Sequence, residues 1–220
     1  MIIQVVNNGS GDWRRSVALV RRQYHKQFGA DVDPSPDAFI TYQTPQARPR
    51  RGAPAGAGAG NILACIGLTR PSAQPFFSEL YLDDPIESIV ERIEGADCPR
   101  DDVAEFGSLA SRSANAGFEL VRHLPVVAWC QGSRYVLLTV TATVASYLER
   151  VGIHFQPVVA ADPARLGAGN AERWGTYYDN EPTAGYVDVA RSIADGSAYG
   201  LGDLGLGLKT SRELGLADAA

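Results

Sequence analysis

Glu105 is the residue whose type and place most directly suggest chemistry. It lies inside residues 103–110, a segment of otherwise apolar and small residues that is predicted to form a strand. Burying a carboxylate there costs free energy unless the group is paired or used. One use is to accept a proton from an attacking amine, or to orient the water that does so. A structural ion pair or an outward-facing side chain would explain the same pattern.

The residues after Glu105 suit an extended ligand that ends in a phosphate. Gly107, inside the strand, predicts a β-bulge or a close backbone approach. A polar turn over residues 111–117 then leads into a helix, whose first N–H groups form an anion site. This order fits a pantetheine arm followed by its phosphate, with Arg112 supplying charge and Gly117 allowing close approach. A surface arginine in an ordinary turn is the alternative.

Other reactive side chains show no pattern of a metal site or a nucleophilic triad. The three histidines have neither ligand spacing nor a nucleophile partner. The three cysteines are odd in number, far apart and outside any C-x-x-C motif. We therefore expect no metal, no disulfide framework and a reducing, cytoplasmic environment.

The region that follows Glu105 resembles the GNAT superfamily of acyltransferases. In that superfamily a loop after the fourth strand grips the pyrophosphate of a thioester donor, and a helix carrying a tyrosine follows the fifth strand. Arg112 and Gly117 are the residues of the loop that resemble its R-x-x-G-x-G/A pattern. The segment TVASYLERVGIHF, residues 143–155, resembles the A-x-x-x-Y-x-x-x-G-F signature and places Tyr147 at the tyrosine.

A narrower resemblance is to the thermostable hemolysin family, which is related in fold to GNAT enzymes and acyl-homoserine lactone synthases. It covers roughly residues 14–190. Five segments follow in the order seen in that family, and residues 48–60 resemble an insertion. The segments are FFSELYLDDPIE (76–87), EFGSLASRS (105–113), LTVTATVASYLERVGI (138–153), ADPARLG (161–167) and WGTYY (174–178).

These resemblances imply transfer of an acyl group from a phosphopantetheine thioester to a small-molecule amine. The thioester would be carried by coenzyme A or a carrier protein, and no cofactor would be tightly bound. Attack would be direct, through a tetrahedral intermediate stabilised by a strand backbone N–H and with no acyl-enzyme. Glu105 would act as the base and Tyr147 as the acid that protonates the departing thiolate. Tyr147 has the spacing of a core aromatic as well.

The resemblances also imply two groups of binding residues. Contacts to the donor are expected from Gly107, Ser108, Leu109, Arg112, Asn115 and Gly117. An acceptor or acyl pocket is expected to include Arg22, Phe28, Glu79, Tyr81, Trp174 and Tyr178. A solvated basic helix face would equally explain the arginine, and ordinary core packing would explain the aromatic residues.

Positioning these residues requires a mixed α/β sheet, and the apolar patterning predicts one. We expect an α/β, GNAT-like fold in which helices flank a mixed, mostly antiparallel sheet. The expected strands are residues 2–6, 38–43, 62–68, 103–110, 135–141 and 153–159. The first expected helix starts at Ser10 or Asp12 and ends at Gly29. The others span residues 84–95, 118–131 and 143–152, and a distortion is expected at Pro125 in the second of these three.

Composition and patterning predict one domain with two unusual segments. The chain has 220 residues, of which 45% are hydrophobic, and we expect residues 1–190 to form the domain. The Arg/Gly/Ala-rich residues 45–60 are expected to form a loop that buries little apolar surface. The Gly/Leu-rich residues 191–220 are expected to form an appendage.

Charge is distributed unevenly along the chain. Residues 1–70 carry nine Arg/Lys and four Asp/Glu, whereas residues 71–220 carry eleven and twenty-one, giving a net charge of −5. The basic first third fits phosphates or an acidic partner such as an acyl carrier protein, although a solvated basic helix explains it equally well. The overall acidity argues against nucleic acid as a partner. The sequence leaves the oligomeric state open.

Two other interpretations of the sequence stay open. One is a GNAT-like binding module without catalysis. The other, suggested by the family's name, is a membrane-active hemolysin. Residues 1–9 have no positively charged region and only a short apolar run, so we expect no secretory signal. No stretch of the sequence approaches the roughly 18 apolar residues of a membrane helix. We therefore expect no membrane insertion.

Overall fold

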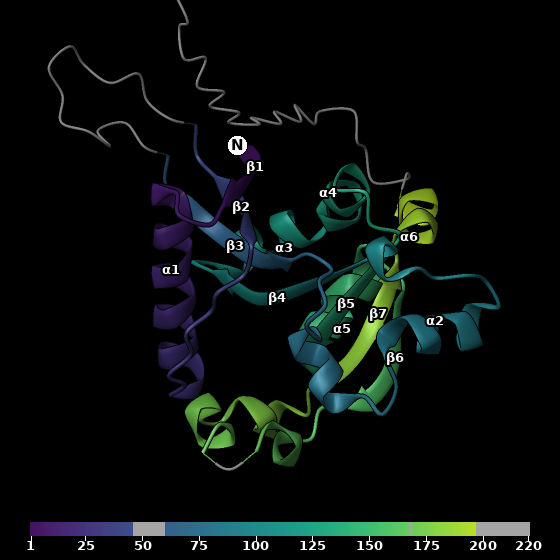
Figure 1. The fold of residues 1–220 in the computed structure, drawn as a ribbon. Helices are drawn as coiled ribbons and strands as arrows, with labels where there is room; N and C mark the ends of the chain where they lie inside the picture. The colour runs from purple at the N-terminus through teal and green to yellow at the C-terminus, as the bar shows by residue number, and fades with distance from the viewer. Residues whose placement is uncertain (46–59, 168, 197–220) are drawn as a thin grey trace, which may run out of the picture.

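A computed structural model describes residues 1–45, 60–167 and 169–196 (Figure 1). It contains a seven-stranded sheet in the order β1-β2-β3-β4-β5-β7-β6. The pairing of β4 with β5 is parallel and the other pairings are antiparallel. The predicted mixed, mostly antiparallel sheet is thereby confirmed. Residues 46–59 of the predicted loop and 197–220 of the predicted appendage lie outside the described residues.

The elements alternate along the chain as the α/β pattern requires. The strands are β1 Ile2–Asn7, β2 Ala38–Gln43, β3 Ile62–Thr69, β4 Val103–Ser111, β5 Tyr135–Val140, β6 Phe155–Ala160 and β7 Thr183–Asp188. The helices are α1 Gly11–Phe28, α2 Ile86–Glu94, α3 Ala114–Val121, α4 Leu124–Cys130, α5 Ala142–Arg150 and α6 Val189–Gly196. Short 3-10 helices connect them: η1 Phe77–Tyr81, η2 Arg100–Asp102, η3 Pro163–Leu166, η4 Ala171–Trp174 and η5 Tyr177–Asn180.

Helices cover both faces of the sheet and enclose three apolar clusters. Side chains of α1 pack with Phe39 and Cys65 on one face, and those of α2 pack with Val103 and Leu137 on the same face. The other face packs against α3, α4, α5 and α6. Figure 1 shows α1 beside β2, β3 and β4, with α3 and α4 on the opposite side. Among the described residues, no helix combines the length and apolar character needed to span a bilayer.

The first helix forms as its sequence predicts. Ser10 caps it, because its Oγ accepts a hydrogen bond from the Trp13 N–H at 3.1 Å. Gly29 ends it with a φ of 66°, and its N–H donates to the His25 carbonyl at 2.9 Å. Val17, Val20 and Tyr24, which recur at helical spacing, are buried.

Two elements of the central layers differ from the prediction. The predicted helix 118–131 is two helices, α3 and α4, which separate at Arg122 and His123 upstream of Pro125. Pro125 lies in the first turn of α4, where a missing N–H costs little. Strand β7 was not predicted at all, although it lies between β5 and β6 in the sheet.

Two peripheral helices lie at the ends of predicted segments. The predicted helix 84–95 begins at Ile86, with Pro85 as its N-cap residue, and the Asp84 carboxylate pairs with Arg92. Its Ile93 is 47% exposed. The first residues of the segment predicted as an appendage belong to α6, whose Ile193 packs against the core.

The parallel strands β4 and β5 separate halfway along their length. Their register runs from Val103 opposite Tyr135 to Phe106 opposite Leu138 and stops there. Beyond this point β4 follows β3 through a bulge, since Gly67 pairs with Gly107 and Cys65 with Ala110. Two residues of β4 therefore oppose one of β3, and Ser108 in the bulge has a φ of 54°. The bulge expected beside Gly107 is present, and we call the opening between β4 and β5 the seam.

An ion pair holds η1 against its neighbours. Arg100 donates to Glu79 through Nη1 at 2.5 Å and Nη2 at 2.9 Å, and Glu79 also accepts from the Phe76 and Ile86 N–H groups. Burial raises the pKa of Glu79, but these hydrogen bonds outweigh it and leave the pKa below its ordinary value. The Glu79 side chain is 6% exposed and that of Arg100 22%. This pair therefore joins η1, the start of α2 and η2.

We expect Glu79→Gln to lower the free energy of unfolding by on the order of 2–3 kcal/mol at pH 7, between the values typical of exposed and of buried pairs. Because the pKa of Glu79 is lowered in the folded state, its stabilisation is present above the ordinary carboxyl pKa and is lost as pH falls through the folded value. Urea unfolding should show the difference shrinking below about pH 4. Arg92→Gln, in the exposed pair with Asp84, should cost less than about 1 kcal/mol. Equal losses in the two variants would contradict this role.

Candidate active site

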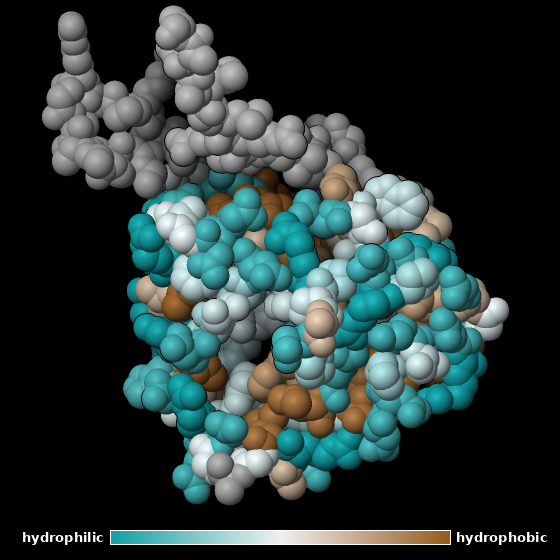
Figure 2. Space-filling model, in the orientation of Figure 1, coloured by the Kyte–Doolittle hydropathy of each residue, from teal (hydrophilic) through white to brown (hydrophobic). Residues whose placement is uncertain are grey.

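A cavity of about 410 Å³ opens on the α1 side of the seam. Its lining comes from α1, the segment after α1, strands β3 to β5, η1 and the segment 166–177. Figure 2 shows the surface hollowed in this region, with hydrophobic surface exposed beside the hollow. Phe77 and Leu80 of η1 line the cavity and are 42% and 41% exposed, respectively. The cavity therefore has an apolar rim at η1 and extends to the seam between β4 and β5.

Glu105 supplies the carboxylate of this cavity. It is 6% exposed, and η1 donates to both of its oxygens: the Ser78 N–H to Oε1 at 2.7 Å and the Phe77 N–H to Oε2 at 3.0 Å. Burial raises the pKa of Glu105 above the ordinary carboxyl value, against the hydrogen bonds from Ser78 and Phe77. The carboxylate is therefore held in place by backbone donors, and Arg100 pairs with Glu79 rather than with it.

Two hydroxyl groups, from β5 and η1, bond to each other beside Glu105. Thr139, the first residue of β5 beyond its last pairing with β4, donates from Oγ1 to Ser78 Oγ at 2.9 Å. Ser78 itself reaches Glu105 through its backbone N–H. All three residues line the cavity. The pattern was not predicted: Ser78 lay inside a recognised segment, and Thr139 looked like an ordinary β-branched strand residue.

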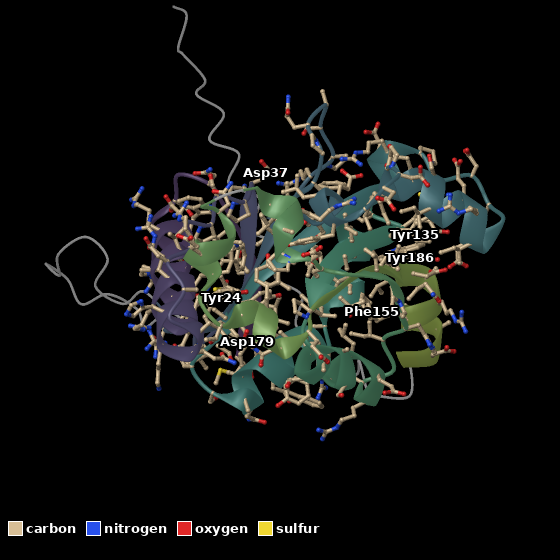
Figure 3. All side chains as sticks on the ribbon, turned by 90° about the horizontal axis from the view of Figure 1, so that it is seen from below. Tyr24, Asp37, Tyr135, Phe155, Asp179 and Tyr186 are labelled. Carbon is tan, nitrogen blue, oxygen red and sulfur yellow. The ribbon has the colours of Figure 1, made fainter. Side chains whose placement is uncertain are left out.

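An aromatic wall closes the side of the cavity toward α1. The Trp174 ring is tilted by 48° against that of Tyr177, with centroids 5.1 Å apart, and the Tyr177 ring stacks with that of Tyr24 of α1. Figure 3 shows Tyr24 and Asp179, the latter in η5, on the α1 side of the molecule, with Tyr135 and Tyr186 on the other. Burial raises the pKa values of Tyr24 and Tyr177, so both stay neutral phenols.

Backbone bonds fix this wall to the end of α1. The Thr176 N–H donates to the Phe28 carbonyl at 2.9 Å, and the Asp31 N–H donates to the Arg173 carbonyl at 2.7 Å. A Cβ on Gly175, whose φ is 53°, would lie 2.0 Å from the Phe28 carbonyl oxygen. Only glycine fits this close approach. Segments separated by almost 150 residues therefore form one side of the cavity.

The residues expected to bind the acceptor divide into two groups. Tyr81 and Trp174 line the cavity, and Tyr81 bonds through its hydroxyl to that of Tyr178 at 2.5 Å. The structure does not bring the remaining residues to the cavity. Arg22 is exposed on α1, Phe28 packs on the rings of Tyr24 and Tyr177, Glu79 pairs with Arg100, and Tyr178 lies behind Tyr81.

The residues expected to bind the donor lie along β4 and at the start of α3. Gly107 and Ser108 line the cavity, whereas Leu109 packs toward the opposite face of the sheet. Arg112 is exposed and donates from Nε to the Ile62 carbonyl at 2.7 Å. Asn115 is exposed in the first turn of α3. A Cβ on Gly117 would lie 3.1 Å from Ser111 Oγ, so α3 approaches β4 closely there.

Tyr147 does not line the cavity that contains Glu105. It lies on α5, half-buried, with its ring 6.3 Å from that of Phe118 on α3. The Arg150 guanidinium lies over the same ring at 5.8 Å. Since α3 and α5 cover the other face of the sheet, Tyr147 and Glu105 approach the seam from opposite sides.

The cavity also carries charged residues that the sequence did not single out. Asp31, Asp33 and Arg173 contribute to its lining, and Asp33 pairs with Arg21 of α1. Nothing in their spacing marked them, because the fold brings them together from distant segments. Within the described ranges no three His, Cys, Asp or Glu side chains gather as they would around a metal ion.

Comparison with solved structures shows where this fold occurs elsewhere. FeeM, titled an N-acyl amino acid synthase from uncultured soil microbes, has a TM-score of 0.53 at 16% identity, covering 89% of this chain and 99% of its own. MesI, titled a CoA-dependent acyl-homoserine lactone synthase, has a TM-score of 0.52 at 16% identity, covering 93% and 98%. LasI, titled an AHL synthase, has a TM-score of 0.51 at 14% identity, covering 88% and 93%. At these identities the likeness concerns the fold, and it confirms the GNAT-like prediction.

Comparison with sequences gives a family. A search among curated proteins found no match. The family model described as "Thermostable hemolysin" matches residues 6–193, which include every element from α1 to β7 and all the residues around the seam. This match covers more of the chain than the five recognised segments did. The chain belongs to the thermostable hemolysin family.

Proposed function

We propose that this protein is an acyltransferase that moves an acyl group from a phosphopantetheine thioester to an amine. The observation that carries the proposal is the buried carboxylate of Glu105, which lines a cavity beside the point where β4 and β5 separate. An amine in the cavity would lie next to a proton acceptor. A thioester reaching the seam from the α3 and α5 side would present its carbonyl to that amine.

The raised pKa of Glu105 fits the role of a base. Burial is its largest cause, and a base with a pKa nearer neutrality holds a proton more readily. The backbone donors of η1 keep the carboxylate in one position, which favours attack in one geometry. Transfer would be direct, without an acyl-enzyme.

The bulge of β4 suits the negative charge that develops on the thioester carbonyl oxygen. A bulge leaves the extra residue out of the regular ladder, so backbone N–H groups near Ser108 become available to a developing oxyanion. The start of α3, with Asn115 in its first turn and Arg112 beside it, would then receive the phosphate of the pantetheine arm. Tyr147 would protonate the departing thiolate from the α5 side.

The solved structures of similar fold support this choice of reaction class. Their titles name acyl-homoserine lactone and N-acyl amino acid synthases. The donor is coenzyme A or the arm of an acidic carrier protein. The carrier is favoured by the net positive charge of residues 1–70, which carry nine Arg/Lys and four Asp/Glu. We propose a small-molecule amine as the acceptor.

Donor binding should be visible as thermal stabilisation of the full chain. Acyl-coenzyme A or acyl-loaded carrier protein at 100 times its dissociation constant should add about 2.7 kcal/mol. Arg112→Gln should weaken this effect at least fivefold in apparent affinity, because it removes the charge but keeps an N–H donor for the Ile62 carbonyl. Arg92→Gln on α2 is the matched control and should behave as wild type. The absence of stabilisation by either donor would contradict the proposal.

Glu105→Gln should lower thioester turnover by about 10²–10⁴-fold with any competent amine, because an amide cannot accept the proton. Thiol release from acyl-coenzyme A measures this. Glu149→Gln, an exposed change on α5, should leave turnover within twofold. Turnover of the Glu105→Gln variant above a tenth of the wild-type rate would contradict the assigned role. If the wild type binds the donor without turnover, the protein is a binding module. If it causes dye leakage from liposomes, it is a membrane-active protein.

Turnover should rise with pH as Glu105 loses its proton, since only the carboxylate form accepts one from the amine. Burial raises the pKa of Glu105, so the midpoint of the acid limb of kcat/KM should lie above the ordinary value of about 4.3. The measurement is kcat/KM against pH at saturating donor. An acid limb that persists unchanged in Glu105→Gln would assign it to another group.

A further inference from the structure

Two oppositely charged residues lie side by side at the cavity without pairing. Asp31 and Arg173 both line it, and the Asp31 N–H donates to the Arg173 carbonyl at 2.7 Å, so their backbones are adjacent. Within the part of the chain that the structure describes, neither side chain forms an ion pair or a hydrogen bond. Both residues are exposed, so they border the open side of the cavity. They therefore offer one negative and one positive group to a ligand.

The aromatic wall fixes the position of this pair. Arg173 directly precedes Trp174, and the Thr176 N–H donates to the Phe28 carbonyl at 2.9 Å. Together with the bond from Asp31 to Arg173, this makes two backbone bonds between the end of α1 and the wall. Charges on a backbone that is already held in place cost less to order when a ligand binds. The pair is therefore suited to recognise a ligand with matching charges.

The remaining charges of the cavity leave one more group for a ligand. Asp33 pairs with Arg21, which lies outside the cavity lining. Glu105 lies deeper, at 6% exposure, and accepts the N–H groups of Phe77 and Ser78. A carboxylate accepts about four hydrogen bonds, so Glu105 can still accept from an amine. The cavity thus offers two carboxylates and one guanidinium, which match a ligand with two amines and one carboxylate.

Aromatic side chains line the same cavity as these charges. Phe77 and Trp174 have ring centroids 5.5 Å apart, and Tyr177 lies next to Trp174. The aliphatic stem of a long charged side chain packs on apolar surface while its charged end stays with polar groups. A chain of methylenes on these rings would connect a charged head at the open side to an amine at Glu105.

We propose that the acceptor is a diamino acid and that its side-chain amine is the group that is acylated. Its α-carboxylate binds Arg173 and its α-ammonium binds Asp31. The neutral side-chain amine attacks the thioester carbonyl: the C–N bond forms, and the amine proton moves to Glu105. The C–S bond breaks, and its electron pair leaves with the thiolate, which Tyr147 protonates. This inference rests on the proposed acyl transfer and names the class of its acceptor.

The opposite orientation, with the α-amine at Glu105, matches the protein less well. It would place the carboxylate at Arg173 and the side-chain ammonium at Asp31. Several methylenes separate those two groups in the ligand, whereas a single backbone bond joins the two residues in the protein. The α-carboxylate and the α-ammonium, by contrast, are attached to one carbon atom. The two orientations give products acylated on different nitrogen atoms.

The first experiment uses the full chain and compares L-lysine with three analogues that each lack one group. Cadaverine lacks the carboxylate, ε-aminocaproate lacks the α-amine, and norleucine lacks the side-chain amine. Lysine should exceed cadaverine and ε-aminocaproate by about tenfold or more in kcat/KM, because each analogue loses one charge-assisted contact. Norleucine should not be acylated, and tandem mass spectrometry should place the acyl group of the lysine product on Nε. L-ornithine and its analogues, one methylene shorter, are measured in parallel.

Two variants assign the contacts to their residues. Arg173→Gln should abolish the preference for lysine over cadaverine, because the carboxylate loses its partner. Asp31→Asn should abolish the preference for lysine over ε-aminocaproate, because the α-ammonium loses its partner. Glu172→Gln, an exposed change on η4 outside the cavity lining, is the matched control and should keep both preferences.

Three outcomes would overturn the proposal, and they differ in what else they overturn. An active wild type that turns over neither diamino acid faster than the analogues would show that the cavity does not bind the charged head. Acylation on Nα, or of norleucine as fast as of lysine, would reverse the orientation. Both results would leave the proposed acyl transfer standing. A wild type that consumes neither acyl-coenzyme A nor acyl carrier protein with any amine would remove the proposed function as well.

Discussion

The separation of β4 from β5 is the constraint on which the rest of the site depends. The two strands pair in parallel for four residues and then part, because the bulge at Ser108 keeps β4 in register with β3. Strand β5 meanwhile keeps its full ladder with β7 out to Val140. Each half of the sheet therefore satisfies its backbone groups on its own side of the opening. The opening exposes strand interior to both faces without leaving either half unsupported.

A carboxylate at the edge of such an opening needs compensation for its burial. Element η1 supplies it, since two of its backbone N–H groups donate to Glu105. The position of η1 depends in turn on Glu79, whose bonds to Arg100 and to the start of α2 hold the segment against the sheet. The two glutamates of this region thus have different roles. Glu79 holds the backbone of η1 in place, and the N–H groups of that backbone hold the Glu105 carboxylate. The pKa of Glu105 is raised mainly by burial, whereas for Glu79 the hydrogen bonds from Arg100 and two backbone N–H groups outweigh burial and lower the pKa.

Local signals predicted much of this arrangement, and long-range contacts account for what they missed. Ser10 and Gly29 bound α1 through short-range hydrogen bonds, and Gly107 marked the bulge, so these features were readable from neighbouring residues. Strand β7 was missed because Gly185 interrupts a short apolar run, and its place between two strands is set by pairing rather than by pattern. The partners of Glu79 and Thr139 come from other elements, so no spacing reveals them.

The aromatic wall bears on the order in which the chain acquires its shape. Its bonds join Thr176 to Phe28 across 148 positions, and β7 follows directly after it. On the ribosome, α1 is complete long before these partners leave the exit tunnel, so Tyr24 and Phe28 remain without their ring contacts to Tyr177 for most of synthesis. Contacts this distant in sequence form slowly, because they close long loops. The aromatic face of α1 in the nascent chain therefore stays uncovered until Tyr177 has been made.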